Sequence, residues 1–218
     1  MTAAGRLMST AALLALAALP RDAGAQTQPE PLSLQGFGMA GLMTFSAADS
    51  FDAVLDTHSG AIYGGGLRLV LPGGPYLEVG AWRFEEDGER AFATSTGQVF
   101  PLGIPMTVTM TPLEITGGWR FHGLLGPRFT PYVGGGFTSM RYEETAEFAG
   151  TDDDVSDRFN GFHLTGGADY RLARWIAVGG DVTWTSIADA IGESGVSAVF
   201  EEDNLGGTSL RVRIILGR

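Results

Sequence analysis

Charged residues alternate with apolar residues along several segments that have the two-residue period of β-strands. Eight of them lie opposite the apolar faces, and they comprise four arginines and four carboxylates. Charges that meet away from water are tolerated only when each finds a partner. The sequence therefore predicts a charge-paired network in the interior of a barrel, formed by Arg68, Glu78, Glu114, Arg120, Asp169, Asp181, Arg211 and Arg213.

Catalytic chemistry has few candidates, because the chain has three histidines and no cysteine. His58 lies beside Asp56 and Ser59, and a hydroxyl nucleophile needs a base within hydrogen-bonding distance. Three polar residues within four positions of a loop are common by chance. Of the other two histidines, His122 falls in a short turn and His163 falls on a polar strand face. We therefore expect no enzymatic activity, no catalytic residue and no cofactor. A lipid-modifying enzyme is kept as an alternative.

An acidic run at Asp152, Asp153 and Asp154, followed by Asp157, could bind a divalent cation weakly, because hard cations prefer several oxygen ligands. The spacing of an EF-hand is absent, and a solvated acidic loop explains the run equally simply. We expect no dedicated metal site there. A looser role, in which divalent ions bridge the loop to lipopolysaccharide, stays open.

The strand pattern that must position these residues is most regular between Phe162 and Thr185. Alternate residues there form one apolar face and one polar face, on two strands joined by a tight turn at Leu172-Ala173. In a soluble barrel the apolar face would point inward. In a transmembrane barrel it would meet lipid, and the polar face would line the lumen.

The N-terminus has the three parts of a secretory signal peptide: a positive start at Arg6, an apolar stretch from Leu7 to Leu19, and Ala-Gly-Ala at 23–25. We predict a signal peptide at 1–25, a short leader at 26–33 and one barrel domain at 34–218. Cleavage would remove two of the 14 basic and one of the 25 acidic residues, leaving a net charge of −12. That charge argues against nucleic acid as a partner.

Eight strand-like segments follow, separated by connections that alternate between long and short. The long connections hold most of the acidic residues, whereas arginines gather in the strands and short turns. This arrangement predicts an all-β fold: an eight-stranded antiparallel up-and-down transmembrane β-barrel with long external loops and short periplasmic turns. The segments are approximately 34–46, 60–71, 76–86, 106–121, 128–142, 159–171, 174–186 and 207–216.

One segment changes its apolar phase part of the way along. Leu113, Ile115 and Trp119 share a face, but before Pro112 the apolar residues are Met106 and Met110, which have the opposite phase. We expect a β-bulge near Thr111-Pro112 to absorb the change.

Three glycine-rich strand motifs carry a family resemblance: PYVGGGF at 131–137, TGGADYRL at 165–172 and IAVGGDV at 176–182. With the signal peptide and eight strands, the chain resembles the small outer-membrane barrels of the OmpA, OmpX, opacity-protein and OmpW type. The resemblance implies a location in the bacterial outer membrane, contact with its lipid and lipopolysaccharide, and insertion by the barrel-assembly machinery. The chain ends in Leu216-Gly217-Arg218, where such barrels usually end in an aromatic residue.

The charge-paired lumen and the lack of a catalytic constellation lead us to expect a non-enzymatic protein with a structural or surface-interaction role and acidic external loops. The external partner is not specified by the sequence. A narrow channel for small solutes, similar to OmpW, is the main alternative.

Overall fold

A computed structural model describes residues 32–94, 98–146, 155–192 and 195–217. The predicted signal peptide, nearly all of the predicted leader, and Asp152, Asp153 and Asp154 lie outside these ranges.

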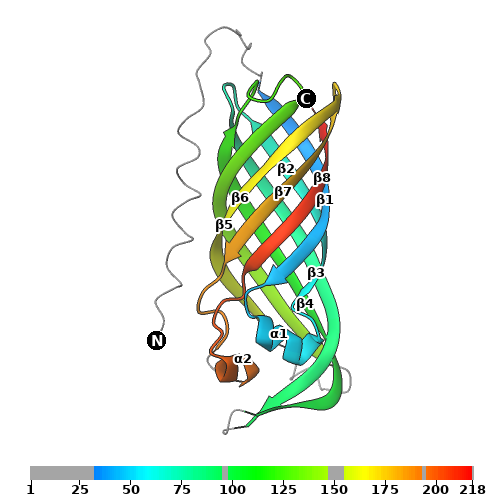
Figure 1. Ribbon diagram of the computed structural model, residues 1–218, viewed down its shortest axis with the longest axis vertical. Helices are drawn as coiled ribbons and strands as arrows, with labels where there is room; N and C mark the ends of the chain where they lie inside the picture. The colour runs from blue at the N-terminus through cyan, green and yellow to red at the C-terminus, as the bar shows by residue number, and fades with distance from the viewer. Residues whose placement is uncertain (1–31, 95–97, 147–154, 193–194, 218) are drawn as a thin grey trace, which may run out of the picture.

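The fold is the predicted closed antiparallel barrel of eight strands (Figure 1). Each strand pairs with the next along the chain, and β1 pairs with β8 to close the cylinder. The strands are β1 (Ser33–Phe45), β2 (Ser59–Val70), β3 (Pro75–Ala93), β4 (Val99–Arg120), β5 (Phe129–Ala146), β6 (Val155–Ala173), β7 (Ile176–Ser186) and β8 (Gly207–Gly217).

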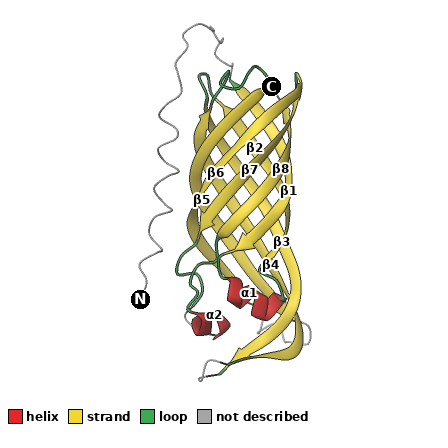
Figure 2. Cartoon of the chain, viewed as in Figure 1, coloured by secondary structure: helices red, strands yellow, loops and turns green. Residues whose placement is uncertain are grey.

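The two ends of the barrel differ. We call the end that holds residues 71–74, 121–128 and 174–175 the turn end, and the opposite end the loop end. Two short helices, α1 (Ala48–Leu55) and α2 (Gly195–Phe200), lie in connections at the loop end (Figure 2). Within the described ranges, no helix is long and apolar enough to span a membrane.

The apolar faces of the strands point outward. Leu67, Val178 and Val212 are 58%, 38% and 64% exposed, whereas Asp181 and Arg211 are only 3% and 2% exposed. In a water-soluble barrel these exposures would be reversed, because burial of apolar surface is what drives such a barrel to fold. The outward leucines and valines therefore form the lipid-facing surface of a membrane barrel.

Four strands are longer than the sequence pattern indicated. Residues 87–105 were expected to be a long loop, but β3 continues to Ala93 and β4 begins at Val99, with a register shift between Glu89 and Ala91. Strands β5 and β6 likewise extend into the expected acidic loop at 143–158. These extensions stand beyond the ends of β1, β2, β7 and β8, as Figure 1 shows for β3 and β4. The extensions do not alternate between apolar and polar residues as the lipid-facing parts of the strands do, so the sequence pattern did not predict them as strands.

The predicted bulge near Thr111-Pro112 is wrong. The pairing of β4 with β5 runs in unbroken register from Met106 to Arg120. Met106 and Met110 are buried, in the same phase as Arg120. The apolar residues change sides because the filling of the barrel changes from charged to apolar, so the strand needs no irregularity.

Candidate functional site

The eight charged residues singled out from the sequence all lie buried inside the barrel. Their ion pairs form one continuous chain that starts at the turn end and alternates in sign. The order along this chain is Arg120, Asp169, Arg68, Glu78, Arg213, Asp181, Arg211 and Glu114. Four positive and four negative groups make the chain neutral as a whole.

The first half of the chain is centred on Glu78, which lies between two guanidinium groups. Arg68 Nε lies 2.7 Å from one oxygen of Glu78, and Arg213 Nη1 lies 2.8 Å from the other. Arg68 also reaches Asp169 with its Nη1 at 2.9 Å, and Arg120 Nη2 lies 3.3 Å from the same Asp169 oxygen. These charged contacts tie β2, β3, β4, β6 and β8 together across the lumen.

The second half is centred on Asp181 and Glu114. Arg211 donates from Nε to Asp181 at 2.7 Å and from Nη1 to Glu114 at 3.0 Å. Two aromatic side chains complete the hydrogen bonding: Tyr132 donates to Asp181 at 3.1 Å, and the Trp82 indole donates to Glu114 at 2.9 Å. Each carboxylate therefore has more than one donor, which offsets the cost of burying its charge.

Aromatic rings fill the space around the arginines. The Arg68 guanidinium lies 5.1 Å from the ring centre of Tyr76 and 4.8 Å from that of Tyr132, and Arg213 lies 4.7 Å from that of Phe37. Cations at these distances are attracted to the face of the ring. Sequence reasoning did not include these rings in the site. The available signal was the two-residue period, which puts Tyr76 on the same strand face as Glu78 and Tyr132 on the same strand face as Thr130.

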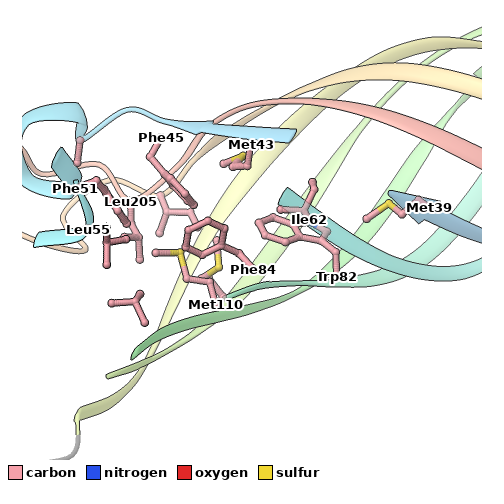
Figure 3. Packing of buried hydrophobic residues seen from close by; sticks show 14 of the residues in the cluster. Met39, Met43, Phe45, Phe51, Leu55, Ile62, Trp82, Phe84, Met110 and Leu205 are labelled. Carbon is pink, nitrogen blue, oxygen red and sulfur yellow. The ribbon is translucent and has the colours of Figure 1, made fainter. Parts of the chain in front are cut away.

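Towards the loop end the filling of the lumen becomes apolar (Figure 3). Helix α1 lies over this apolar half and contributes Phe51, which stacks on Phe45 with 4.4 Å between ring centres. The sequence pattern did not predict this apolar half of the lumen. Its buried members include Met43, Phe45, Phe51, Leu55, Ile62, Phe84, Met106, Val108, Met110, Met140, Ile187 and Leu205.

His163 lies buried in the lumen beside the charged half. Its Nε2 is 2.8 Å from the Thr116 hydroxyl and its Nδ1 is 2.8 Å from the Thr138 hydroxyl. A neutral imidazole donates from one nitrogen and accepts at the other, and a hydroxyl can serve either role. Both nitrogens of His163 are therefore satisfied by β4 and β5.

The loop histidine His58 does not pair with Asp56. Its Nδ1 lies 2.9 Å from Asp52 in α1, and both side chains are partly exposed. Asp56 instead ends α1 with a left-handed backbone, and the carbonyl of Ser59 accepts a hydrogen bond from Thr57. The contacts of His58 thus give it a carboxylate partner but no hydroxyl to activate in the described part of the chain.

Of the acidic run, only Asp157 lies in the described ranges, where it is exposed on β6. No cluster of three histidine or carboxylate side chains that could hold a metal is found among the described residues. The weak cation loop stays a prediction.

The loop end also holds a recess of about 720 Å³, bounded by α1, α2 and the inner faces of the extended strands. Its floor is largely apolar, and its charged residues are mostly acidic. The apolar lining includes Phe51, Val54, Leu55, Met106, Phe159 and Ile191, and the charged lining consists of Arg90, Glu144, Asp157 and Asp189.

A closed barrel with lipid-facing apolar residues and a charge-paired interior defines an integral outer-membrane barrel. The sequence model of the outer membrane protein beta-barrel domain matches residues 9–213, and the chain belongs to this family. A comparison with curated protein sequences gives no match.

Solved structures to which this chain is similar include three bacterial proteins. The N-terminal β-barrel domain of Pseudomonas aeruginosa OprF is 11% identical over 86% of this chain and 98% of its own, with a TM-score of 0.47. Neisserial surface protein A is 10% identical over 85% and 96%, with a TM-score of 0.48. A major outer membrane protein from Thermus thermophilus is 15% identical over 84% and 99%, with a TM-score of 0.47.

Proposed function

We propose that this chain is a closed, non-enzymatic barrel of the bacterial outer membrane, with its turn end in the periplasm and its loop end outside. Its role is structural or that of a surface-interaction protein. The observation that carries the proposal is the filling of the lumen by two successive layers. The charged chain from Arg120 to Glu114 fills one half, and the apolar cluster with α1 fills the other.

Each layer resists the passage of ions for its own reason. A hydrated ion crossing the charged layer would have to break ion pairs of 2.6–3.3 Å that span the lumen. An ion crossing the apolar layer would lose its hydration without gaining a polar partner, which is costly. An eight-stranded barrel has little free bore even before these side chains are placed.

Planar-bilayer recording of the purified protein tests the proposal. We expect no steady conductance from bilayers that contain the protein, under conditions in which a porin of known conductance gives its usual steps. The protein content of the bilayer is checked afterwards by gel, so that an absence of conductance cannot be due to failed insertion. Steady, ion-selective steps would instead favour the narrow channel for small solutes.

The surface-interaction role is supported by the loop end. The extended β3–β6 strands, α1 and α2 surround the acidic recess there, where an external partner has access to it. Lipid and lipopolysaccharide would surround the barrel, and the barrel-assembly machinery would insert it. Weak divalent-cation bridging between Asp152, Asp153, Asp154 and Asp157 and lipopolysaccharide belongs to the same proposal.

A lipid-modifying activity is the remaining alternative, and His58 with Asp52 would be its base. An acyl-turnover assay on lipid A with the unmutated protein tests it directly. We expect no turnover. Turnover that disappears in His58→Ala would replace the non-enzymatic proposal.

A further inference from the structure

The turn end of the barrel has a second opening, a pocket of about 300 Å³ at the mouth of the lumen. Its charged lining consists of four arginines, Arg120, Arg128, Arg171 and Arg174, and a single carboxylate, Asp169, in the described part of the chain. Among the described lining residues, four positive groups against one negative group give a net charge of +3. None of the proposed roles of the barrel uses this charge.

The fold brings these arginines together from different parts of the chain. Arg120 and Asp169 lie buried on the inward faces of β4 and β6. The amide of Arg171 donates to the carbonyl of Arg128 at 2.8 Å, which holds the 121–128 turn against the end of β6. Arg174 lies in the β6–β7 turn, next to Trp175, whose carbonyl accepts from the Gly217 amide of β8 at 3.0 Å.

The carboxylate of the mouth is already engaged inside the barrel. Asp169 is bound by Arg68 at 2.9 Å and by Arg120 at 3.3 Å, so it belongs to the neutral chain of the lumen. The side chains of Arg128, Arg171 and Arg174 are exposed at the rim. The positive charge of the mouth therefore faces outward, towards solvent and the neighbouring lipid headgroups.

In the described part of the chain the exposed carboxylates are confined to one end of the barrel, whereas exposed arginines lie both there and at the turn end. The exposed carboxylates lie at the loop end, and they are Asp49, Asp52, Asp56, Glu85, Asp87, Glu89, Asp157, Asp189, Glu201 and Asp203. The turn end has exposed arginines and no exposed carboxylate in these ranges. An acidic protein that gathers arginines around one small pocket presents a local attraction for anions.

We infer that the arginine-lined mouth at the turn end binds a phosphate group. A guanidinium presents a planar pair of donors that matches two oxygens of a phosphate, and several arginines around one pocket can each bind in this way. A pocket of about 300 Å³ has room for a phosphate with a small substituent. The phosphate comes either from a lipid headgroup of the adjacent leaflet or from a soluble phosphate compound.

Two measurements on the full-length mature protein separate these sources. In the first, inorganic phosphate is titrated into the protein in uncharged maltoside micelles, at constant ionic strength adjusted with chloride, and binding is measured by calorimetry. In the second, micelles are supplied with phosphatidylglycerol without free phosphate, and native mass spectrometry counts the lipid retained by the protein.

The test variant is Arg128→Gln/Arg171→Gln/Arg174→Gln, which leaves the buried network intact. The matched control is Arg141→Gln, an exposed arginine of β5 away from the turn end. We expect the triple variant to bind the phosphate group about tenfold more weakly, equivalent to about 1.4 kcal/mol. The control should bind like the unmutated protein. Heat-dependent mobility on an SDS gel verifies that each variant is folded, and the single variants Arg128→Gln and Arg174→Gln replace the triple variant if it is not.

Binding of inorganic phosphate that is lost in the arginine variants supports a soluble phosphate compound. Retention of phosphatidylglycerol without binding of inorganic phosphate, again lost in the variants, supports a lipid headgroup. Absence of both, or binding that is equal in the variants and the unmutated protein, overturns the inference. None of these outcomes depends on whether the lumen conducts.

Discussion

At the residue scale, the interior is governed by the pairing of each buried charge. Asp181 has a dense set of contacts, because Arg211 Nε lies 2.7 Å away, Arg213 Nε lies 2.6 Å away and Tyr132 donates at 3.1 Å. Removing one member of such a set takes an opposite charge away from each of its buried partners, and this loss is larger than the net contribution of the intact pair.

The substitution Asp181→Asn tests this. It keeps the size of the side chain but leaves two buried guanidinium groups without their shared carboxylate, and we expect it to destabilise the barrel by about 3–5 kcal/mol. Equilibrium unfolding in urea, in lipid vesicles, measures the change. The matched control is Asp189→Asn at an exposed loop position, which should change stability by no more than about 0.5 kcal/mol. Equal stabilities of the two variants would mean that the pairing contributes little.

At the element scale, the close approach of neighbouring strands depends on glycine at particular positions. A Cβ atom added at Gly136 of β5 would collide with the carbonyl oxygen of Ile115 in β4. A Cβ added at Gly166 of β6 would meet nothing within 4 Å. Both residues lie within glycine-rich strand motifs, but Gly136 has the inward phase of β5 and Gly166 has the outward phase of β6.

Gly136→Ala should therefore destabilise the barrel by about 1–3 kcal/mol, since the β4–β5 pairing must shift to admit the methyl group. Gly166→Ala should have little effect on the same urea transition. The fraction of protein that refolds into lipid vesicles provides a second measure. A larger loss in Gly166→Ala than in Gly136→Ala would contradict the packing of these two strands.

At the scale of the whole molecule, the barrel is turned inside out relative to a soluble one. Apolar residues such as Leu67, Val212 and Trp184 face outward from its strands, and its arginine–carboxylate chain lies inside. This arrangement is stable only when lipid replaces water around the cylinder, because exposed apolar surface on this scale would otherwise associate.

Val212→Arg distinguishes the two environments. Val212 lies midway along β8 and is 64% exposed, so arginine at this position would cause no harm in water. In a bilayer it should cost about 2–4 kcal/mol. Urea unfolding in lipid vesicles measures this cost, with Gln98→Arg, at the exposed residue just before β4, as the control. An unchanged transition in Val212→Arg would contradict the placement of this surface in lipid.

The sequence determined the strand count, the antiparallel order and the eight buried charges of the lumen. A strand between lipid and lumen has apolar residues on one face and polar residues on the other, and this alternation is visible in the sequence. Strand extensions outside the lipid carry no such apolar pattern. For this reason β3 and β5 were expected to end too early, and β4 and β6 were expected to begin too late. The same limit applies to α1, whose apolar residues in a polar loop gave no indication of what they would cover.

Only the tertiary structure decided which charges pair, and that Met106 and Met110 turn inward to an apolar half of the lumen. It also brought Arg120, Arg128, Arg171 and Arg174 to one mouth. Pairing partners come from strands far apart in the sequence, and the closure of the sheet sets which of them face each other. The alternation along one strand fixes the side of each residue, but the identity of its neighbours across the lumen depends on the register of all eight strands together.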